Sequence, residues 1–431
     1  MPAPKRTAAA ILERLLQGES PEERLRLLRP RPPDHEPLPP PVPDGSDHTR
    51  EGLERRRALL REQGIVIDRL ARAAPDIAPD ALAGNIENLV GLAALPVGVI
   101  GPLRINGSEA HGDFYVPLAT TEGALVASYH RGALVMSQAG GVSALCTMES
   151  VSRAPCFVFP NMCDAATFLA WVIPRYDALQ DTVAQTSRHC RLNDVRTALF
   201  GKELFLVFEY TTGDAAGQNM VTLATDAICR KLVEESPVKP RRWYVEGNMS
   251  GDKKATMLSF LGARGKKVVA EVTIPRELAC GILHAEPEEM VRYWKTSFLG
   301  GVQSGSIGVQ GHVANSLTAM FIACGQDAAC ISEASVGVTH LDLTDGGDLY
   351  ACLMLPNLIV GTVGGGTHLP TARECLEMIG CYGEGKARKF AEICCAVALG
   401  GEISIIAAMA GGRFAHAHAK YGRKPPNEKA E

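Results

Sequence analysis

Four short segments place isolated ionisable side chains among small or apolar residues. They are Thr120-Thr-Glu-Gly123, residues 247–254 with their Asp-Lys-Lys end, residues 323–329 around Asp327, and His416-Ala-His418. Together they offer a carboxylic acid, a lysine, an aspartate and a histidine. A fixed cation can hold a developing oxyanion, and acids can supply protons. The set therefore suits the reduction of a carbonyl group.

Glu122 is the most informative of these residues. It lies beside two threonines and a glycine, directly before an apolar helical pattern, so we expect it to be poorly solvated. Desolvation raises the pKa of a carboxyl group and favours its protonated form, which can donate a proton. A helix cap is the alternative, with the threonines at the cap and Glu122 near the first turn.

The other three segments also have ordinary structural interpretations. An Asp-Lys-Lys sequence is usually a solvated surface turn. Asp327 lies in an apolar stretch that predicts a helix, where it could be the buried partner of an arginine. A histidine near the end of a chain is most often simply exposed.

Two glycine-rich loops lie among the same elements. Residues 361–367 (Gly-Thr-Val-Gly-Gly-Gly-Thr) could let backbone amides approach a phosphate, although they match neither a Walker sequence nor Gly-x-Gly-x-x-Gly. Residues 213–219 precede a predicted helix, and a helix N-terminus suits an anion. Close packing of glycine against another backbone explains either loop equally well.

The bulk composition excludes several classes of protein. A chain of 431 residues is expected to form two or three domains, and its net charge of −4 argues against a general nucleic-acid binder. The 13 cysteines show no zinc-finger spacing and predict reduced thiols packed in cores. No uninterrupted apolar run reaches the roughly 18–20 residues of a membrane span, and no secretory signal is seen. We expect a cytoplasmic protein without metal or membrane contact.

The order of predicted elements indicates an α+β fold. Residues 29–45 are proline-rich and predict an extended linker, between charged helical patterns at 5–29 and 48–73. Further helices are predicted at 165–185, 220–235, 314–330 and 386–410, and strands at 203–210, 242–245 and 267–273. The strand–helix–strand order around 157–244 suggests a small α+β domain inserted into a larger one.

Six motifs, in order, resemble those of the 3-hydroxy-3-methylglutaryl-coenzyme A (HMG-CoA) reductase family. They are Glu87-Asn-Leu-Val-Gly91, Leu95-Pro-Val-Gly-Val-Ile-Gly-Pro102, Ala119-Thr-Thr-Glu-Gly123, Gly251-Asp-Lys-Lys254, Gly325-Gln-Asp327 and the glycine loop 361–367. The resemblance runs from about residue 51 to the C-terminus, and is to the catalytic portion of class I members without their membrane anchor. It implies the reduction of HMG-CoA to mevalonate and CoA with two NADPH, in the mevalonate pathway of isoprenoid synthesis.

The resemblance also implies a domain layout. A flexible N-terminal segment (1–45) and a helical region (46–86) would precede a large, mostly helical substrate domain (87–154 and 245–431). A small ferredoxin-like cofactor domain (155–244) would be inserted into it. A homodimer or higher oligomer is implied, because in the family the site is completed across the subunit interface, with residues 87–91 near it.

The resemblance assigns roles to the candidate residues. Lys253 would stabilise the oxyanion on the thioester carbonyl, Glu122 would protonate the aldehyde-stage oxygen, and Asp327 would link the two. His418, with His416 as its alternative, would protonate the CoA thiolate. The carboxylate and hydroxyl end of the substrate would meet Arg153, Asp252, Lys254 and Asn315, and the CoA phosphates would lie near Ser128 and Arg131.

For the cofactor, the resemblance points to three short segments and a tail residue. The expected contacts are Asp214, Gly217 and Asn219; Gly364, Gly365 and Thr367; Ser187 and Arg188; and Arg423. Ser187 and Arg188 match a Thr-Ser-Arg segment that meets the 2′-phosphate in class I members, which favours NADPH over NADH.

Four departures from the family pattern are visible. Glu246 stands where the family usually has a serine near the substrate, and Leu134 replaces an arginine directed to the CoA phosphate. Residues 308–312 are one residue shorter than usual, and Lys424 occupies the position of a regulatory serine. The departures leave two alternatives open: a reductase for another acyl-CoA, and a catalytically silent homologue used for binding.

Overall fold

The computed structural model describes residues 20–43, 50–66, 85 and 94–412. The predicted α+β class is confirmed. Ten strands form one sheet, whose main path runs β7-β4-β6-β3-β8-β10-β9. Off this path, β1 pairs with β2 and β3, and β5 pairs with β6. All strand pairs are antiparallel except β1 and β3, which are parallel. The strands are β1 (Val97–Gly107), β2 (His111–Ala119), β3 (Val142–Arg153), β4 (Cys156–Val158), β5 (Arg191–Phe200), β6 (Glu203–Thr211), β7 (Arg242–Tyr244), β8 (Gly265–Ile274), β9 (Val338–Leu343) and β10 (Leu349–Leu358).

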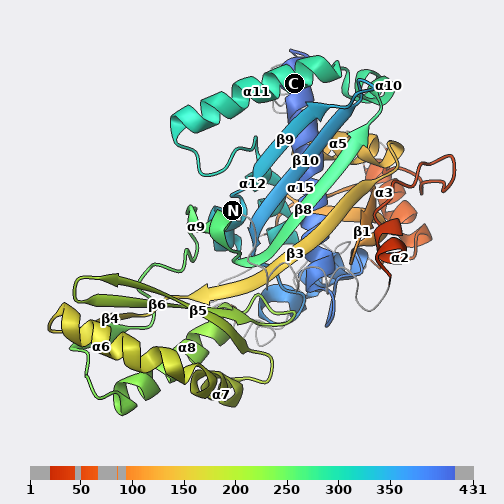
Figure 1. Cartoon of the computed structure of the whole chain (residues 1–431). Helices are drawn as coiled ribbons and strands as arrows, with labels where there is room; N and C mark the ends of the chain where they lie inside the picture. Colours follow the sequence, from red (N-terminus) through yellow and green to blue (C-terminus); the bar gives the residue numbers. More distant parts are fainter. Residues whose placement is uncertain (1–19, 44–49, 67–84, 86–93, 413–431) are drawn as a thin grey trace, which may run out of the picture.

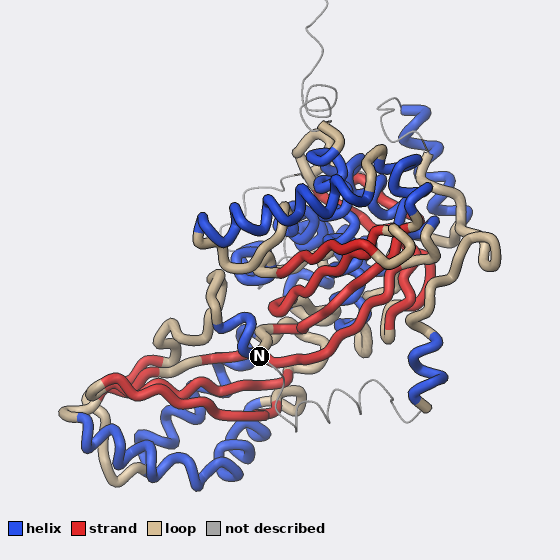
Figure 2. Tube along the Cα trace, turned by 45° about the horizontal axis from the view of Figure 1, so that its top comes forward, coloured by secondary structure: helices blue, strands red, loops and turns tan. Residues whose placement is uncertain are grey.

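Strand β3 connects the two parts of the molecule (Figure 1). Most of its length pairs with β8, and its last three residues, Val151 to Arg153, pair with β6. Strands β4 to β7 belong to a small lobe, residues 156–244, with α6 (Met162–Val172), α7 (Tyr176–Thr186) and α8 (Gln218–Glu235). These helices lie on one face of the lobe's strands (Figure 2). Arg153 therefore ends the strand at the junction of the two parts.

The larger part contains β1 to β3 and β8 to β10 as well as helices, so its prediction as mostly helical underestimates the sheet. Its helices are α5 (Leu125–Gln138), α9 (Leu258–Leu261), α10 (Arg276–Leu278), α11 (Pro287–Ser304), α12 (Val313–Ala323), α13 (Ile331–Ala334), α14 (Pro370–Met378) and α15 (Ala387–Ala410). In β8, Val268, Ala270, Val272 and Ile274 are buried and alternate with more exposed residues, the period of a strand with one face on the core.

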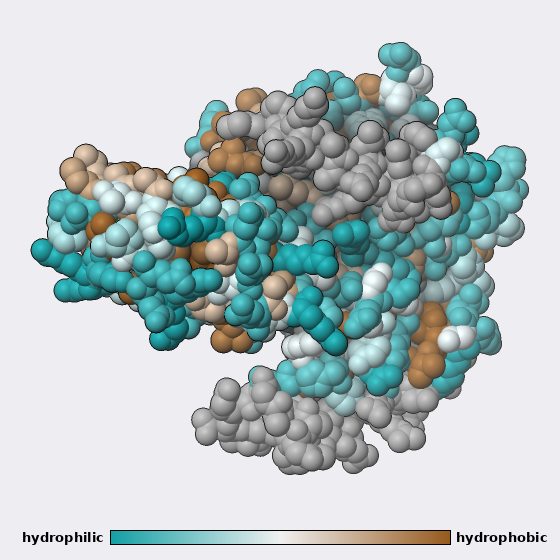
Figure 3. All heavy atoms as spheres, turned by 60° about the horizontal axis from the view of Figure 1, so that its bottom comes forward, coloured by the Kyte–Doolittle hydropathy of each residue, from teal (hydrophilic) through white to brown (hydrophobic). Residues whose placement is uncertain are grey.

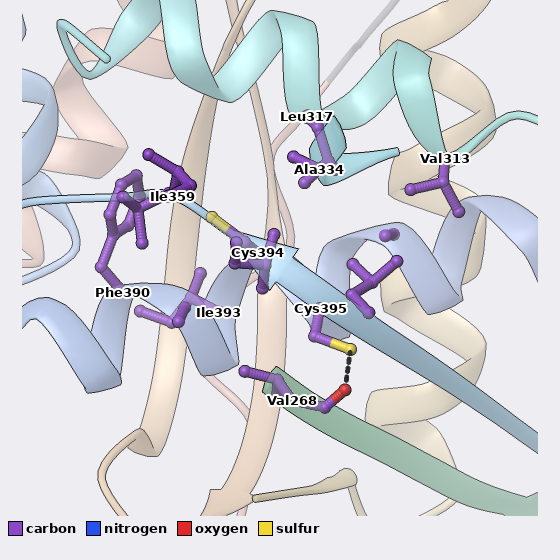
Figure 4. Close-up of a cluster of buried hydrophobic side chains, with 14 of the residues drawn as sticks. Val268, Val313, Leu317, Ala334, Ile359, Phe390, Ile393, Cys394 and Cys395 are labelled. Atoms are coloured by element: carbon purple, nitrogen blue, oxygen red, sulfur yellow. Dashed lines mark hydrogen bonds between the residues drawn. The ribbon is translucent and has the colours of Figure 1, made fainter. Parts of the chain in front are cut away.

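Helix α15 is the centre of the core. Cys394 and Cys395 lie on it among Val268 of β8, Leu317 of α12 and Ile359 (Figure 4). Helix α5 crosses α15 at a glycine pair, because a Cβ on Gly132 would lie 2.0 Å from the carbonyl oxygen of Gly400. Among the described helices, α15 alone is long and apolar enough to cross a membrane, but 83% of its apolar window is buried inside the structure. A core helix of this kind needs no membrane.

One predicted helix is interrupted and another ends earlier than expected. The helix predicted over 165–185 is α6 and α7 with a 3-10 turn, Ile173–Arg175, between them, where Pro174 interrupts the pattern. The helix predicted over 314–330 stops at Ala323, because Gly325 adopts a φ of +64°. The predictions for β6, β7, β8, α8 and α15 are confirmed to within a few residues.

The described N-terminal residues lie on the edge formed by β1 and β2. Helices α2 (Pro21–Arg26) and α3 (Arg50–Glu62) flank a segment whose described residues form neither helix nor strand. It is not extended throughout as expected, because the amides of His35 and Glu36 donate to the Pro32 carbonyl oxygen and form a turn. This segment is docked: the buried Arg104 donates to the carbonyl oxygens of Arg31, Glu36 and Pro37 and pairs with Asp113 at 2.8 Å. Residues 31–37 are therefore held by a buried guanidinium group.

The cysteines and the surface agree with the composition. All thirteen cysteines are free, and ten are buried, as predicted. On the face drawn in Figure 3, the described surface is largely hydrophilic, with small separate hydrophobic patches. Water therefore contacts most of this described face.

Candidate active site

Lys253 lies in the loop between β7 and α9, in a left-handed conformation with a φ of +54°. Its backbone amide donates to Glu333 Oε1 at 3.1 Å, which fixes the loop on α13. Its Nζ lies 2.8 Å from Asp327 Oδ2. The hydrogen bond to Asp327 raises the pKa of Lys253, so the ammonium form is favoured. Both side chains remain about two-fifths exposed, open to a ligand.

Asp327 lies in a turn outside any α-helix, so the prediction that placed it within an apolar helix is wrong. It caps the 3-10 helix Ala328–Cys330, and its Oδ1 accepts from the amide of Ala329 at 3.0 Å. The alternative that it pairs with a buried arginine is also wrong, because its partner is Lys253. The turn leaves its second oxygen free to hold the ammonium group.

A buried network of charged side chains supports the loop that carries Lys253. Arg264 donates to both oxygens of Glu333 at 2.6 Å and lies 2.9 Å from Asp252. Arg153 donates to Asp252 Oδ2 at 2.9 Å. Burial alone would raise the pKa of Asp252, but Arg264 and Arg153 outweigh it and hold that pKa below 3.8. The solvated-turn interpretation thus fits only the exposed Lys254, whose Nζ donates to the carbonyl oxygen of Asp252.

Glu122 is exposed, contrary to the prediction of a poorly solvated carboxylate. It does not cap α5, since the cap residue is Ala124, with a φ of +71° and no side-chain bond. The Glu122 amide donates to Thr120 Oγ1, and its carboxylate accepts from Asn315 Nδ2 at 3.3 Å. Within the described part of the chain, Glu122 forms no hydrogen bond or ion pair with Lys253 or Asp327. The structure therefore joins two of these three residues.

Some of the residues that position Asn315 at the start of α12 were not identified by the motifs. The Asn315 amide donates to the carbonyl oxygen of His312, which caps α12. The His312 ring stacks on Tyr129, and Nδ1 lies 3.4 Å from Oε1 of the fully buried Glu402. Burial would raise the pKa of Glu402, but His312 and two backbone amides lower it, so this buried carboxylate is ionised. Glu402, His312 and Tyr129 thus position the start of α12.

Ser128 and Arg131, on α5, meet at one residue of α15. Ser128 Oγ lies 2.9 Å from Ser404 Oγ, and Arg131 donates to the carbonyl and hydroxyl oxygens of Ser404. Both candidate residues therefore share one face of α5, as their spacing of three residues predicts.

The two glycine loops and the Asp327 turn lie against one another. A Cβ on Gly361 would lie 2.5 Å from the amide of Ala216, and one on Gly325 would lie 2.3 Å from the Gly366 carbonyl oxygen. Gly217 precedes α8 with a φ of +83°. The Asp214 carboxylate accepts from the amides of residues 385–387 and so caps α15. The interpretation of packing against another backbone thus holds for Gly361, whereas a Cβ on Gly217 would meet the Thr212 side chain. The structure brings these motifs together.

The remaining candidates fall into three groups. Gly364 and Gly365 have positive φ and open space where a Cβ would stand, whereas Thr367 is buried and donates to the Gly364 carbonyl oxygen. Ser187 accepts from the His189 amide, exposed Arg188 bonds to the His189 ring, and Asn219 lies in the first turn of α8. His416, His418, Arg423 and residues 87–91 lie outside the described residues. In the part of the chain that is described, no group of three metal-ligating side chains is placed to hold an ion.

Comparison with known proteins agrees with this fold. The family model described as hydroxymethylglutaryl-coenzyme A reductase matches residues 52–423. The 3-hydroxy-3-methylglutaryl-coenzyme A reductases of Pyrococcus abyssi and Methanocaldococcus jannaschii are 44% and 38% identical, over 86% of this chain and 92% of each relative. A class II reductase structure from Streptococcus pneumoniae, bound to NADPH, has a TM-score of 0.68 at 18% identity, over 83% of this chain and 96% of that one. The chain belongs to the hydroxymethylglutaryl-coenzyme A reductase family.

Proposed function

We propose that this protein reduces HMG-CoA to mevalonate and CoA with two NADPH, as a step of the mevalonate pathway. The support is membership of the family, together with 38–44% identity to proteins of that name over most of the chain. The structural observation that carries it is the ion pair between Lys253 and Asp327. This pair holds an ammonium group on the loop between β7 and α9.

Lys253 and Asp327 supply the electrostatic part of the mechanism. Lys253 Nζ stabilises the negative charge that develops on the thioester oxygen and later on the aldehyde oxygen. A fixed cation does this without reorganisation during the reaction. Asp327 keeps the ammonium group charged and in place, since its hydrogen bond raises the pKa of Lys253.

Glu122 and His418 supply protons in this proposal. Glu122, held by Asn315, protonates the aldehyde-stage oxygen, and His418 protonates the departing CoA thiolate. Glu122 is exposed in the single chain, which fits a site that is completed when a second subunit covers it. We therefore include a homodimer or higher oligomer, with a shared site, in the proposal.

The substrate would lie between the two parts of the molecule. Arg153, Asp252 and Lys254 converge at the end of β3, where a guanidinium fork suits a carboxylate. Asn315 would meet the hydroxyl end. Ser128 and Arg131 would direct the CoA phosphates along α5.

The described residues fit a phosphorylated dinucleotide. Arg188 is exposed after α7 and suits a 2′-phosphate, and the exposed Gly364 and Gly365 leave their backbone open to a phosphate. Asp214, Gly217, Asn219, Thr367 and Ser187 shape or flank these loops, and Arg423 is the candidate from the tail. NADPH, when bound, supplies the hydride. We propose residues 155–244 as the cofactor domain, with the other domain boundaries as expected and a cytoplasmic location.

A spectrophotometric assay tests the proposed function. Purified protein should oxidise NADPH in the presence of HMG-CoA, faster than it oxidises NADH, and release free CoA thiol in a ratio of one to two NADPH. Folded protein that oxidises neither cofactor with HMG-CoA would refute it. Turnover with a different branched acyl-CoA alone would support the alternative substrate, which the contact between Glu246 and Arg153 favours.

A further inference from the structure

Glu246 is held firmly against the candidate substrate-binding arginine. Its Oε2 accepts from Arg153 Nη1 at 3.4 Å and from the Ala154 amide at 3.3 Å. Its Oε1 accepts from the Asn248 amide at 2.7 Å. Three donors from two segments therefore orient a carboxylate that is 23% exposed. It is a fixed part of the site.

The same guanidinium group has little capacity left for another carboxylate. Arg153 Nη1 serves both Glu246 and Asp252, and Nη2 donates to the side chain and backbone oxygens of Gln218. Its buried Nε has no hydrogen-bond partner among the described residues. Because Nε is buried, a substrate carboxylate that approached Arg153 in the two-bond geometry would meet Nη1 and Nη2, and it would have to take Nη1 from Glu246.

The charge balance points the same way. The network joined by these contacts contains two cations, Arg153 and Arg264. It contains three carboxylates, those of Glu246, Asp252 and Glu333. Lys253 is paired with Asp327, and Lys254 is the remaining exposed cation beside the network. Counted together, these four cations and four carboxylates balance, so an anionic substrate enters a cluster that has no surplus of positive charge to receive it.

We infer that Glu246 sets the acyl-group specificity of this site by competing with the substrate's carboxylate for Arg153. The inference rests on the proposed function, since it concerns the same site. Glu246 weakens the binding of acyl groups that end in a carboxylate, such as HMG-CoA. It leaves the binding of uncharged acyl groups of similar shape unaffected.

The test compares two substrates in Glu246→Gln and Glu246→Ser. One is HMG-CoA, and the other is 3-hydroxy-3-methylpentanoyl-CoA, in which a methyl group replaces the carboxylate. We expect both substitutions to lower the KM for HMG-CoA by about ten-fold, the scale of one charge-assisted hydrogen bond, with kcat changed by less than about three-fold. The KM for the uncharged analogue should not fall. Glu277→Gln, which removes an exposed carboxylate on α10, is the matched control and should change neither KM.

Binding measured without turnover separates this inference from the proposed function. Calorimetric titration of the protein with HMG-CoA should show the same ten-fold gain in affinity for Glu246→Gln, whether or not NADPH is oxidised. An inactive wild-type protein with this gain would refute only the proposed reaction. An unchanged affinity for HMG-CoA in both folded variants, or an equal gain for both acyl-CoAs, would overturn the inference.

Discussion

Lys253 Nζ and Asp327 Oδ2 lie 2.8 Å apart, and each side chain is held by a separate backbone device. Lys253 is fixed by a left-handed backbone and by the bond from its amide to Glu333. Asp327 is fixed because its other oxygen caps a 3-10 helix. These backbone contacts fix the two loops that bring the side chains together, so the ammonium group is preorganised for a developing oxyanion.

Lys253→Ala should abolish turnover without unfolding the protein. The loss of a preorganised oxyanion partner costs a factor of about 100 or more in kcat. Alanine has the same Cβ, so it adds no strain at the left-handed position. Initial rates of NADPH oxidation, circular dichroism and NADPH binding measure the three properties. The exposed Lys202→Ala is the control, and an unchanged rate in Lys253→Ala would contradict the assignment.

Asp327→Asn and Asp327→Ala should separate the charge of Asp327 from its capping bond. Asparagine still accepts from the Ala329 amide but no longer raises the pKa of Lys253, so kcat should fall about ten-fold or more. The alkaline limb of the pH–rate profile should move to lower pH, because Lys253 then deprotonates more easily. Alanine should in addition lower the free energy of unfolding by about 1 kcal/mol. Equal pH–rate profiles for wild type and Asp327→Asn would contradict this coupling.

The fold could be predicted where local pattern and burial coincide. Helix α15 and strand β8 have the apolar and β-branched content of buried elements, and both are where the sequence predicts them. Strands β1 and β10 were not predicted. Gly98, Gly101 and Pro102 interrupt the strand pattern of β1. Both strands are stabilised by pairing with distant segments, which a local pattern does not show. The early end of α12 depends on a left-handed glycine inside an apolar run, which looks helical from its composition alone.

The site could be predicted only where a family motif carries it. The motifs identified Lys253 and Asp327, which the structure joins in an ion pair, and the family resemblance added Arg153. Arg264 and Glu333 were not identified, because they lie 69 residues apart in sequence and neither belongs to a local motif. The exposure of Glu122 was wrongly predicted, because solvent access depends on what packs above a residue rather than on its neighbours in sequence.

Glu333→Gln should destabilise the protein more than the loss of a surface carboxylate. Glu333 is fully buried and accepts two bonds of 2.6 Å from Arg264. Removal of one member of a buried pair costs about 3–5 kcal/mol, and here it would leave Arg264 with Asp252 as its remaining carboxylate partner. Urea unfolding followed by circular dichroism measures the loss.

Glu377→Gln is the matched control for that experiment. Glu377 pairs with Arg373 on the exposed face of α14, and such a pair contributes about 0.5 kcal/mol or less. A loss in Glu333→Gln no larger than that of the control would show that the buried pair does not support the loop of Lys253.

His130 should make the free energy of unfolding depend on pH below about 6.5. Burial lowers the pKa of His130 in the folded state, and its Nδ1 accepts from the Gly101 amide, which requires the unprotonated nitrogen. As the pH falls below 6.5, the unfolded chain binds a proton at this position that the folded chain does not. The folded state therefore loses stability, by at most about 1.4 kcal/mol per pH unit for one proton.

His130→Asn keeps an acceptor near the Nδ1 position but has no such proton, so its stability should decline less between about pH 8 and pH 5. The wild-type advantage at pH 8 should shrink on acidification, as measured by urea unfolding at each pH. His35→Asn, which changes an exposed histidine, is the control, and parallel pH profiles for wild type and His130→Asn would refute the effect.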